Sequence, residues 1–134
     1  MNVVVSDPKT RKAYSVKADD DVFIGKKIGE EIDLGRIGAA GFAAKITGGS
    51  DKNGFPMRGD LPGTARRKIL IVKMKKDGIR TRISKRGNTV DRDIHQLNVV
   101  LTKEGQGKID EVLNIEKKEE TLSEKDKALQ EAKK

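Results

Sequence analysis

Glycine recurs every few residues along one stretch of this chain, at positions 25, 29, 35, 38 and 41. Glycine is a poor helix former because its backbone loses the most conformational freedom on ordering, and it readily takes up the conformations that tight turns need. A sustained helix is therefore disfavoured here, and short strands joined by turns are expected instead.

Segments with β character flank this stretch. They are rich in β-branched residues or alternate apolar with polar ones, and they cover residues 2–5, 13–17, 42–47, 68–75, 79–84 and 97–102. Between two of them, Lys76, Asp77 and Gly78 provide an Asp-Gly hairpin signal. Many short strands separated by turns predict a mainly β protein: a small, antiparallel, barrel-like domain over residues 1–102.

The pattern changes after Thr102. Ile109, Val112 and Leu113 follow helical spacing, and residues 121–124 have the sequence TLSE, a capping-box pattern that can start a last helix. The apolar stripe of that helix is thin and most of its other residues are charged, so we expect it to be marginal or to depend on a partner. Residues 103–134 are thus predicted to form a charged helical tail.

The basic residues are concentrated in one part of the chain. The chain has 29 Lys and Arg against 21 Asp and Glu, a net charge of +8. Residues 52–92 hold 13 of the basic side chains and only three acidic ones, so they carry all of the excess. Such clustering costs self-repulsion unless a polyanion neutralises it. The alternative is a basic face that only keeps the protein soluble.

The side chains found near the basic residues indicate which kind of polyanion the protein binds. In the strand expected at residues 79–84, Arg80 and Arg82 fall on one side and the isoleucines on the other. None of the four aromatic residues lies among the arginines and lysines from residue 66 onward, whereas proteins that bind single strands interleave aromatics with charge for base stacking. We therefore expect contacts with the phosphates, 2′-hydroxyls and shape of folded RNA. Charge alone does not exclude DNA, but no helix-turn-helix or zinc pattern is present.

The glycine-rich segment ITGGSDKNGFPMRGDL (residues 46–61) invites two other interpretations. Its residues 49–54 have the spacing of a phosphate-binding P-loop, but Phe55 follows where a lysine is required. Asp51 and Asn53 could begin a calcium loop, but no glutamate follows at the distance that a bidentate ligand needs. A rigid turn fits better, with positive φ angles at its glycines and with Phe55 and Met57 held against the core.

Catalysis finds little support in the sequence. His95 is the single histidine and is expected to be a structural or surface residue. There is no cysteine, which excludes disulfides and thiolate metal sites, and we expect no cofactor, no metal and no catalytic residue. The longest strongly apolar run, residues 69–72, is far too short to span a membrane, and the N-terminus has no signal-peptide pattern, so a cytoplasmic location is expected.

Two motifs resemble a known family. ITGGSDKNGFPM (residues 46–57) is similar to the signature of the small-subunit ribosomal protein S6e family of archaea and eukaryotes, and GIRTRISKRG (residues 78–87) is similar to its basic segment. The resemblance extends over residues 2–105. It implies a compact β-rich domain bound to the RNA of the small ribosomal subunit, neighbouring ribosomal proteins as partners, and no enzymatic activity. The short C-terminus resembles archaeal members, and phosphorylation of C-terminal serines is not carried over.

The candidate RNA-binding residues are the basic side chains of the charged stretch. They are Lys52, Arg58, Arg66, Arg67, Lys68, Lys73, Lys75, Lys76, Arg80, Arg82, Lys85, Arg86 and Arg92, with Lys52 and Arg58 of second rank. The first alternative is a translation-associated protein–protein adaptor that recruits a partner through its charged tail. An enzyme built on His95 and the acidic residues 19–21 ranks last.

Overall fold

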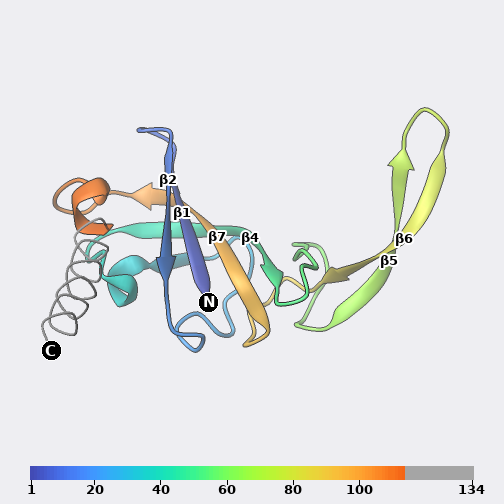
Figure 1. The fold of residues 1–134 in the computed structure, drawn as a ribbon, viewed down its shortest axis with the longest axis horizontal. Helices are drawn as coiled ribbons and strands as arrows, with labels where there is room; N and C mark the ends of the chain where they lie inside the picture. Colours follow the sequence, from blue (N-terminus) through green and yellow to red (C-terminus); the bar gives the residue numbers. More distant parts are fainter. Residues whose placement is uncertain (114–134) are drawn as a thin grey trace, which may run out of the picture.

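A computed structural model describes residues 1–113 of the chain, and the helix expected from residue 121 onward lies outside the described residues. The protein is mainly β, as predicted, with a five-stranded sheet in the order β2-β1-β7-β4-β3 and a separate two-stranded hairpin (Figure 1). The sheet strands are β1 (Asn2–Asp7), β2 (Lys12–Lys17), β3 (Glu31–Asp33), β4 (Ala43–Asp51) and β7 (Ile94–Lys103). The hairpin strands are β5 (Arg66–Met74) and β6 (Ile79–Arg86).

The sheet departs from the predicted antiparallel barrel in two ways. β1 pairs with β7 in parallel, while the other pairs are antiparallel, so the sheet is mixed. The sheet is also open, because β2 and β3 lie at its two edges and do not pair with each other. Local patterns predict strands joined by tight turns, but β1 and β7 come from opposite ends of the domain. No turn between them fixes their relative direction.

The core is assembled by strand periodicity. Alternate residues of β1 and β7 are buried, including Val3, Val5, Val99 and Leu101, as two-residue alternation in a half-buried strand requires. Further strands and loops add to the same cluster, and its largest fully buried side chains include Phe42, Leu34, Ile46, Ile94 and Leu97. Complete burial of such a side chain contributes about 1.5–3 kcal/mol. Residues 109–113 are helical, and their Ile109 and Leu113 join this core.

The glycine-rich stretch forms turns around one short 3-10 helix, η1 (Leu34–Ile37), as its composition predicts. The Asp33 carboxylate accepts a hydrogen bond of 2.9 Å from the Gly35 backbone N–H and so caps this helix at its start. Gly38 ends the helix in the left-handed conformation at φ 93°. Local turn chemistry therefore accounts for this part of the chain.

The segment at residues 46–61 is less of a loop than expected, because β4 runs through both of its first glycines to Asp51. Gly54 has the predicted positive φ, at 85°, but Gly48 and Gly49 do not, so that part of the prediction was wrong. Gly49 is needed for a different reason: a Cβ atom placed there would lie 2.4 Å from the carbonyl oxygen of Gln96 on β7. Met57 is buried in the core, which confirms its predicted role.

We expect Gly49→Ala to lower the free energy of unfolding by about 1–3 kcal/mol, because the added methyl group must push β4 away from β7. Gly48→Ala is the matched control, since nothing lies within 4 Å of a Cβ atom there and its φ is not positive. Urea denaturation followed by circular dichroism measures both. Equal losses in the two variants would contradict the close-contact explanation.

Candidate nucleic-acid interface

The hairpin of β5 and β6 projects away from the five-stranded sheet (Figure 1). The two strands pair antiparallel, with a register shift between Val72 and Met74, and a turn over residues 75–78 joins them. Gly78 in this turn has a φ of 63°, which confirms the hairpin expected from the Asp-Gly signal. None of the hairpin side chains belongs to the core cluster of the described residues. The hairpin is an outlying element carried by the domain.

Strand register divides the hairpin side chains between two faces. Directly opposed residues of an antiparallel pair point to the same side, and successive residues along a strand point to opposite sides. One side, called the basic face below, comprises Lys68, Leu70, Val72, Arg80, Arg82 and Ser84. The other, called the isoleucine face, comprises Arg67, Ile69, Ile71, Met74, Ile79, Thr81, Ile83 and Lys85. The alternation predicted for residues 79–84 is therefore correct.

The root of the hairpin is tied to the end of β4 by an ion cluster around the buried side chains of Asp51 and Arg86. The Arg66 guanidinium donates to the Asp51 carboxylate at 3.0 Å, and Arg86 lies 3.5 Å from the same oxygen. Arg86 also donates to Asp93 at 3.1 Å. Because Arg66 and Arg86 are directly opposed in the register, one carboxylate holds the first residue of β5 and the last of β6 together.

Asp51 also organises the turn that follows it. Its carboxylate accepts hydrogen bonds of 2.9 Å from the backbone N–H groups of both Asn53 and Phe55. Burial alone would raise the pKa of Asp51, but these two hydrogen bonds and the charges of Arg66 and Arg86 outweigh it and hold the pKa below its usual value of 3.8. The carboxylate is therefore an anion at neutral pH.

Two further features of the hairpin root are the contact of Arg66 with Phe55 and the burial of Arg86. The Arg66 guanidinium lies over the Phe55 ring, 4.3 Å from its centre, so Phe55 supports an arginine rather than a base. The Nε of Arg86 is buried and has no hydrogen-bond partner among the described residues. Arg86 is thus enclosed by protein groups.

The structure brings ten of the thirteen candidate residues together on the hairpin, between Arg66 and Arg86. Lys52, Arg58 and Arg92 lie outside it, and the latter two pair with Asp60 and Asp21. Nine candidates form no salt bridge within residues 1–113: Lys52, Arg67, Lys68, Lys73, Lys75, Lys76, Arg80, Arg82 and Lys85. Eight of these nine are on the hairpin.

The sequence analysis did not predict that Asp51 contacts the arginines at the hairpin root. Asp51 was weighed there only as a calcium ligand, whereas its carboxylate contacts arginines 15 and 35 residues away. No local pattern signals such a pairing. The strand alternation predicted that these isoleucines share one face. It could not predict that this face is exposed, because exposure depends on where the hairpin lies relative to the core.

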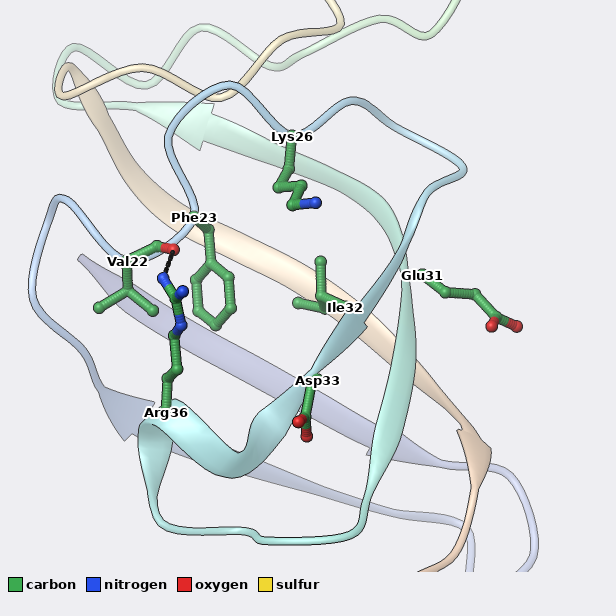
Figure 2. A pocket seen from close by; sticks show the side chains of 7 residues that line it. All are labelled: Val22, Phe23, Lys26, Glu31, Ile32, Asp33 and Arg36. Atoms are coloured by element: carbon green, nitrogen blue, oxygen red, sulfur yellow. Dashed lines mark hydrogen bonds between the residues drawn. The ribbon is translucent and has the colours of Figure 1, made fainter.

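Other parts of the molecule offer little for chemistry. A pocket of about 210 Å³ lies between the loop at residues 22–26 and β3, with Phe23 and Ile32 lining it (Figure 2). At its edge the Arg36 side chain donates to the Val22 carbonyl oxygen at 3.3 Å, and the Glu31 carboxylate points away (Figure 2). Acidic and basic side chains are balanced around it, and no Ser, Thr, Cys or His lines it.

The residues considered for catalysis are all exposed. His95 is an exposed residue of β7, and the acidic run at residues 19–21 makes ion pairs with the N-terminal amine and Arg92. Within residues 1–113 no three His, Cys, Asp or Glu side chains are grouped as a metal site would need. In the same range, no helix has the length and hydrophobicity to cross a bilayer.

The fold and the charge distribution favour a nucleic-acid-binding class over an enzyme. The sequence model of the family described as Ribosomal protein S6e matches residues 1–114, and the chain belongs to this family. Relatives named "Small ribosomal subunit protein eS6" include that of Methanocaldococcus jannaschii, 42% identical over 84% of this chain and 90% of the relative. That of Methanoregula boonei is 40% identical over 93% of this chain and 96% of the relative. The resemblance seen in the two motifs is therefore confirmed.

We expect Asp51→Asn to destabilise the protein by about 3 kcal/mol, because it leaves Arg86 buried with a weaker counter-charge. Asp60→Asn is the matched control, since it removes an exposed carboxylate paired with Arg58 and should change stability little. Guanidinium denaturation at pH 7 measures both. A loss no larger for Asp51→Asn than for Asp60→Asn would show that the cluster does not stabilise the fold.

The comparison of wild type with Asp51→Asn also leads to a prediction of how the stability difference depends on pH. The folded-state pKa of Asp51 lies below its unfolded value, so its contribution to stability is complete well above pH 3.8 and is lost as the pH falls through the folded-state pKa. The difference in unfolding free energy between wild type and Asp51→Asn should therefore narrow as the pH is lowered below 3.8. A difference that widens on acidification would reverse the assigned direction of the shift.

Proposed function

We propose that the protein is a structural constituent of the small ribosomal subunit and that it binds ribosomal RNA through the basic face of its hairpin. Membership of the ribosomal protein S6e family and the names of its archaeal relatives support the first part. The second part rests on one observation: lysines and arginines without acidic partners in the described structure are gathered on an element that projects from the domain. The protein acts in translation, at the ribosome in the cytoplasm, and is not an enzyme.

The candidate residues divide into two roles under this proposal. Arg66 and Arg86 hold the hairpin root through Asp51 and so position the others. The direct contacts are assigned to Lys68, Arg80 and Arg82 on the basic face and to Lys73, Lys75 and Lys76 at and beside the tip. The other five are secondary: Arg58, Arg92 and Lys52 lie outside the hairpin, and Arg67 and Lys85 lie on its isoleucine face.

The contacts are electrostatic and depend on a preformed shape. Arginine can donate two parallel hydrogen bonds to one phosphate, and lysine adds a point charge. Arg80 and Arg82 are two residues apart on one strand, so their Cα atoms are about 6.7 Å apart and both side chains face the same way. Because the ribbon is already ordered, binding does not first have to fix a flexible chain.

The side chains on this face favour recognition of backbone and shape over recognition of bases. The hairpin has no aromatic residue, and Phe55 beside its root is covered by the Arg66 guanidinium. Stacking of unpaired bases therefore has no platform on the hairpin, whereas phosphates and 2′-hydroxyls of folded RNA can be reached by the basic side chains.

The alternative function, a translation-associated protein–protein adaptor, is favoured by a different surface, the isoleucine face of the same hairpin. An adaptor that makes no RNA contact would not bind purified small-subunit RNA at any salt concentration. RNA binding that weakens steeply with salt supports the ribosomal role.

We expect the double variant Arg80→Ala, Arg82→Ala to bind small-subunit RNA more weakly and with a flatter salt dependence. Each lost phosphate contact should reduce the slope of log K against log salt by about 0.7–0.9. Lys9→Ala, Lys12→Ala is the matched control, because both lysines are exposed on the domain far along the chain from the hairpin and already pair with Glu104 and Asp110. Filter binding between low and moderate salt gives the slopes.

Two outcomes of this experiment would count against the proposal. An unchanged slope in the Arg80, Arg82 variant would remove these two residues from the interface. An equal reduction in the Lys9, Lys12 control would mean that net charge alone, rather than the basic face, determines binding. Co-sedimentation of the wild-type protein with small subunits at high salt tests separately whether it belongs to the particle.

A further inference from the structure

The hairpin exposes large apolar side chains as well as charged ones. Met74 is 51% exposed, Ile79 is 47% exposed and Ile83 is 37% exposed. A two-stranded ribbon has no second layer of its own to cover such residues and is marginally stable in water. Contiguous exposed apolar side chains on a soluble domain usually mark a surface that a partner covers.

These three residues lie together on the isoleucine face, whereas Leu70 and Val72, which are 57% and 47% exposed, lie among the cations of the basic face. Ile69 is opposite Ile83, and Met74 is opposite Ile79, so the apolar side chains of β5 and β6 adjoin across the ribbon. The RNA contacts proposed above come from the other face and the tip. Anything that covers the isoleucines is therefore on the far side of the ribbon from the proposed RNA contacts.

Charges bracket this apolar surface. At the root, Arg67 and Lys85 oppose each other and share the isoleucine face. At the tip are Lys75 and Lys76, and the single acidic residue of the hairpin is Asp77 in the turn. A complementary surface is thus apolar in its middle and acidic at both ends.

This chemistry selects among the possible occupants. An RNA backbone would leave the isoleucines without an apolar partner, and this face has no aromatic ring on which bases could stack. A second copy of the chain that docked through its own hairpin would place Arg67 and Lys85 against further cations, which is repulsive in either orientation. A protein segment with apolar side chains flanked by Asp or Glu satisfies both requirements.

We propose that the isoleucine face is the docking surface for a neighbouring protein of the small subunit, one that presents an apolar patch flanked by acidic residues. The hairpin then lies between two kinds of partner, with protein on the isoleucine face and RNA on the basic face. Apart from the tip lysines Lys75 and Lys76, which either partner can reach, the protein contact and the RNA contact use different side chains.

Photo-cross-linking tests this inference with a matched pair of positions. Ile79 and Val72 are both 47% exposed but lie on opposite faces. A benzophenone amino acid is placed at either position, each full-length variant is assembled into small subunits with the RNA and total proteins of an archaeal small subunit, and the adducts are identified by mass spectrometry. We expect protein adducts from position 79, in a peptide containing apolar residues with Asp or Glu beside them, and RNA adducts from position 72.

The possible results are decisive in each direction. RNA adducts, adducts to a second copy of this chain, or no adduct from position 79 would overturn the inference. Protein adducts from position 79 without RNA adducts from position 72 would uphold it and count against the proposed RNA contact instead. The failure of one proposal is therefore distinguishable from the failure of the other.

A second measurement removes the dependence on a bulky probe. The double variant Ile79→Thr, Ile83→Thr keeps β-branched residues in the strand and removes apolar surface, and Ile24→Thr makes the same kind of change at an exposed isoleucine outside the hairpin. In competition with wild type for assembly into subunits, we expect the first variant to be disfavoured about tenfold and the second to compete nearly equally. Equal competition by both variants would also overturn the inference.

Discussion

The arrangement of the molecule depends on one buried carboxylate, that of Asp51. It ends β4, accepts the backbone hydrogen bonds of the turn that follows, and contacts an arginine from each hairpin strand. Burying charged groups costs desolvation free energy, so such a cluster is weak support for stability as such. Its physical effect is to specify a position: it holds the hairpin where Arg66 and Arg86 reach this carboxylate together, beside the backbone hydrogen bonds that join Arg86 to Pro56 and Arg58.

That attachment determines which way each face of the hairpin points. Because side chains alternate along a strand, a shift of one residue at the root would exchange the basic and isoleucine faces. The opposed arginines hold β5 and β6 in register, and the pairing of Ile69 with Ile83 continues it along the ribbon. A local electrostatic contact at the root thus influences the orientation of side chains as far as Met74 and Ile79, at the other end of the strands.

The parts of this structure that were predictable are those specified by neighbours in sequence. The strands, the Asp-Gly hairpin turn and the two faces at residues 79–84 follow from local alternation and turn chemistry. The parallel pairing of β1 with β7 and the open edges of the sheet were not predicted, because they depend on contacts between distant segments. The role of Asp51 and the burial of Arg86 also depend on contacts between distant segments. In the sequence, Arg86 lies among other basic residues and looks like another exposed cation.

The separation of charge between the domain and the hairpin has a consequence for assembly. On the domain, several basic side chains have acidic neighbours, as in Lys9 with Glu104 and Arg92 with Asp21, whereas most hairpin cations have none in the described structure. The domain has its own core, to which the hairpin strands contribute no side chain. The domain can therefore fold on its buried apolar contacts, while the hairpin combines self-repelling cations with uncovered isoleucines. Under the proposals made above, partners that cover its two faces relieve both of these costs, so association stabilises the hairpin far more than the domain that carries it.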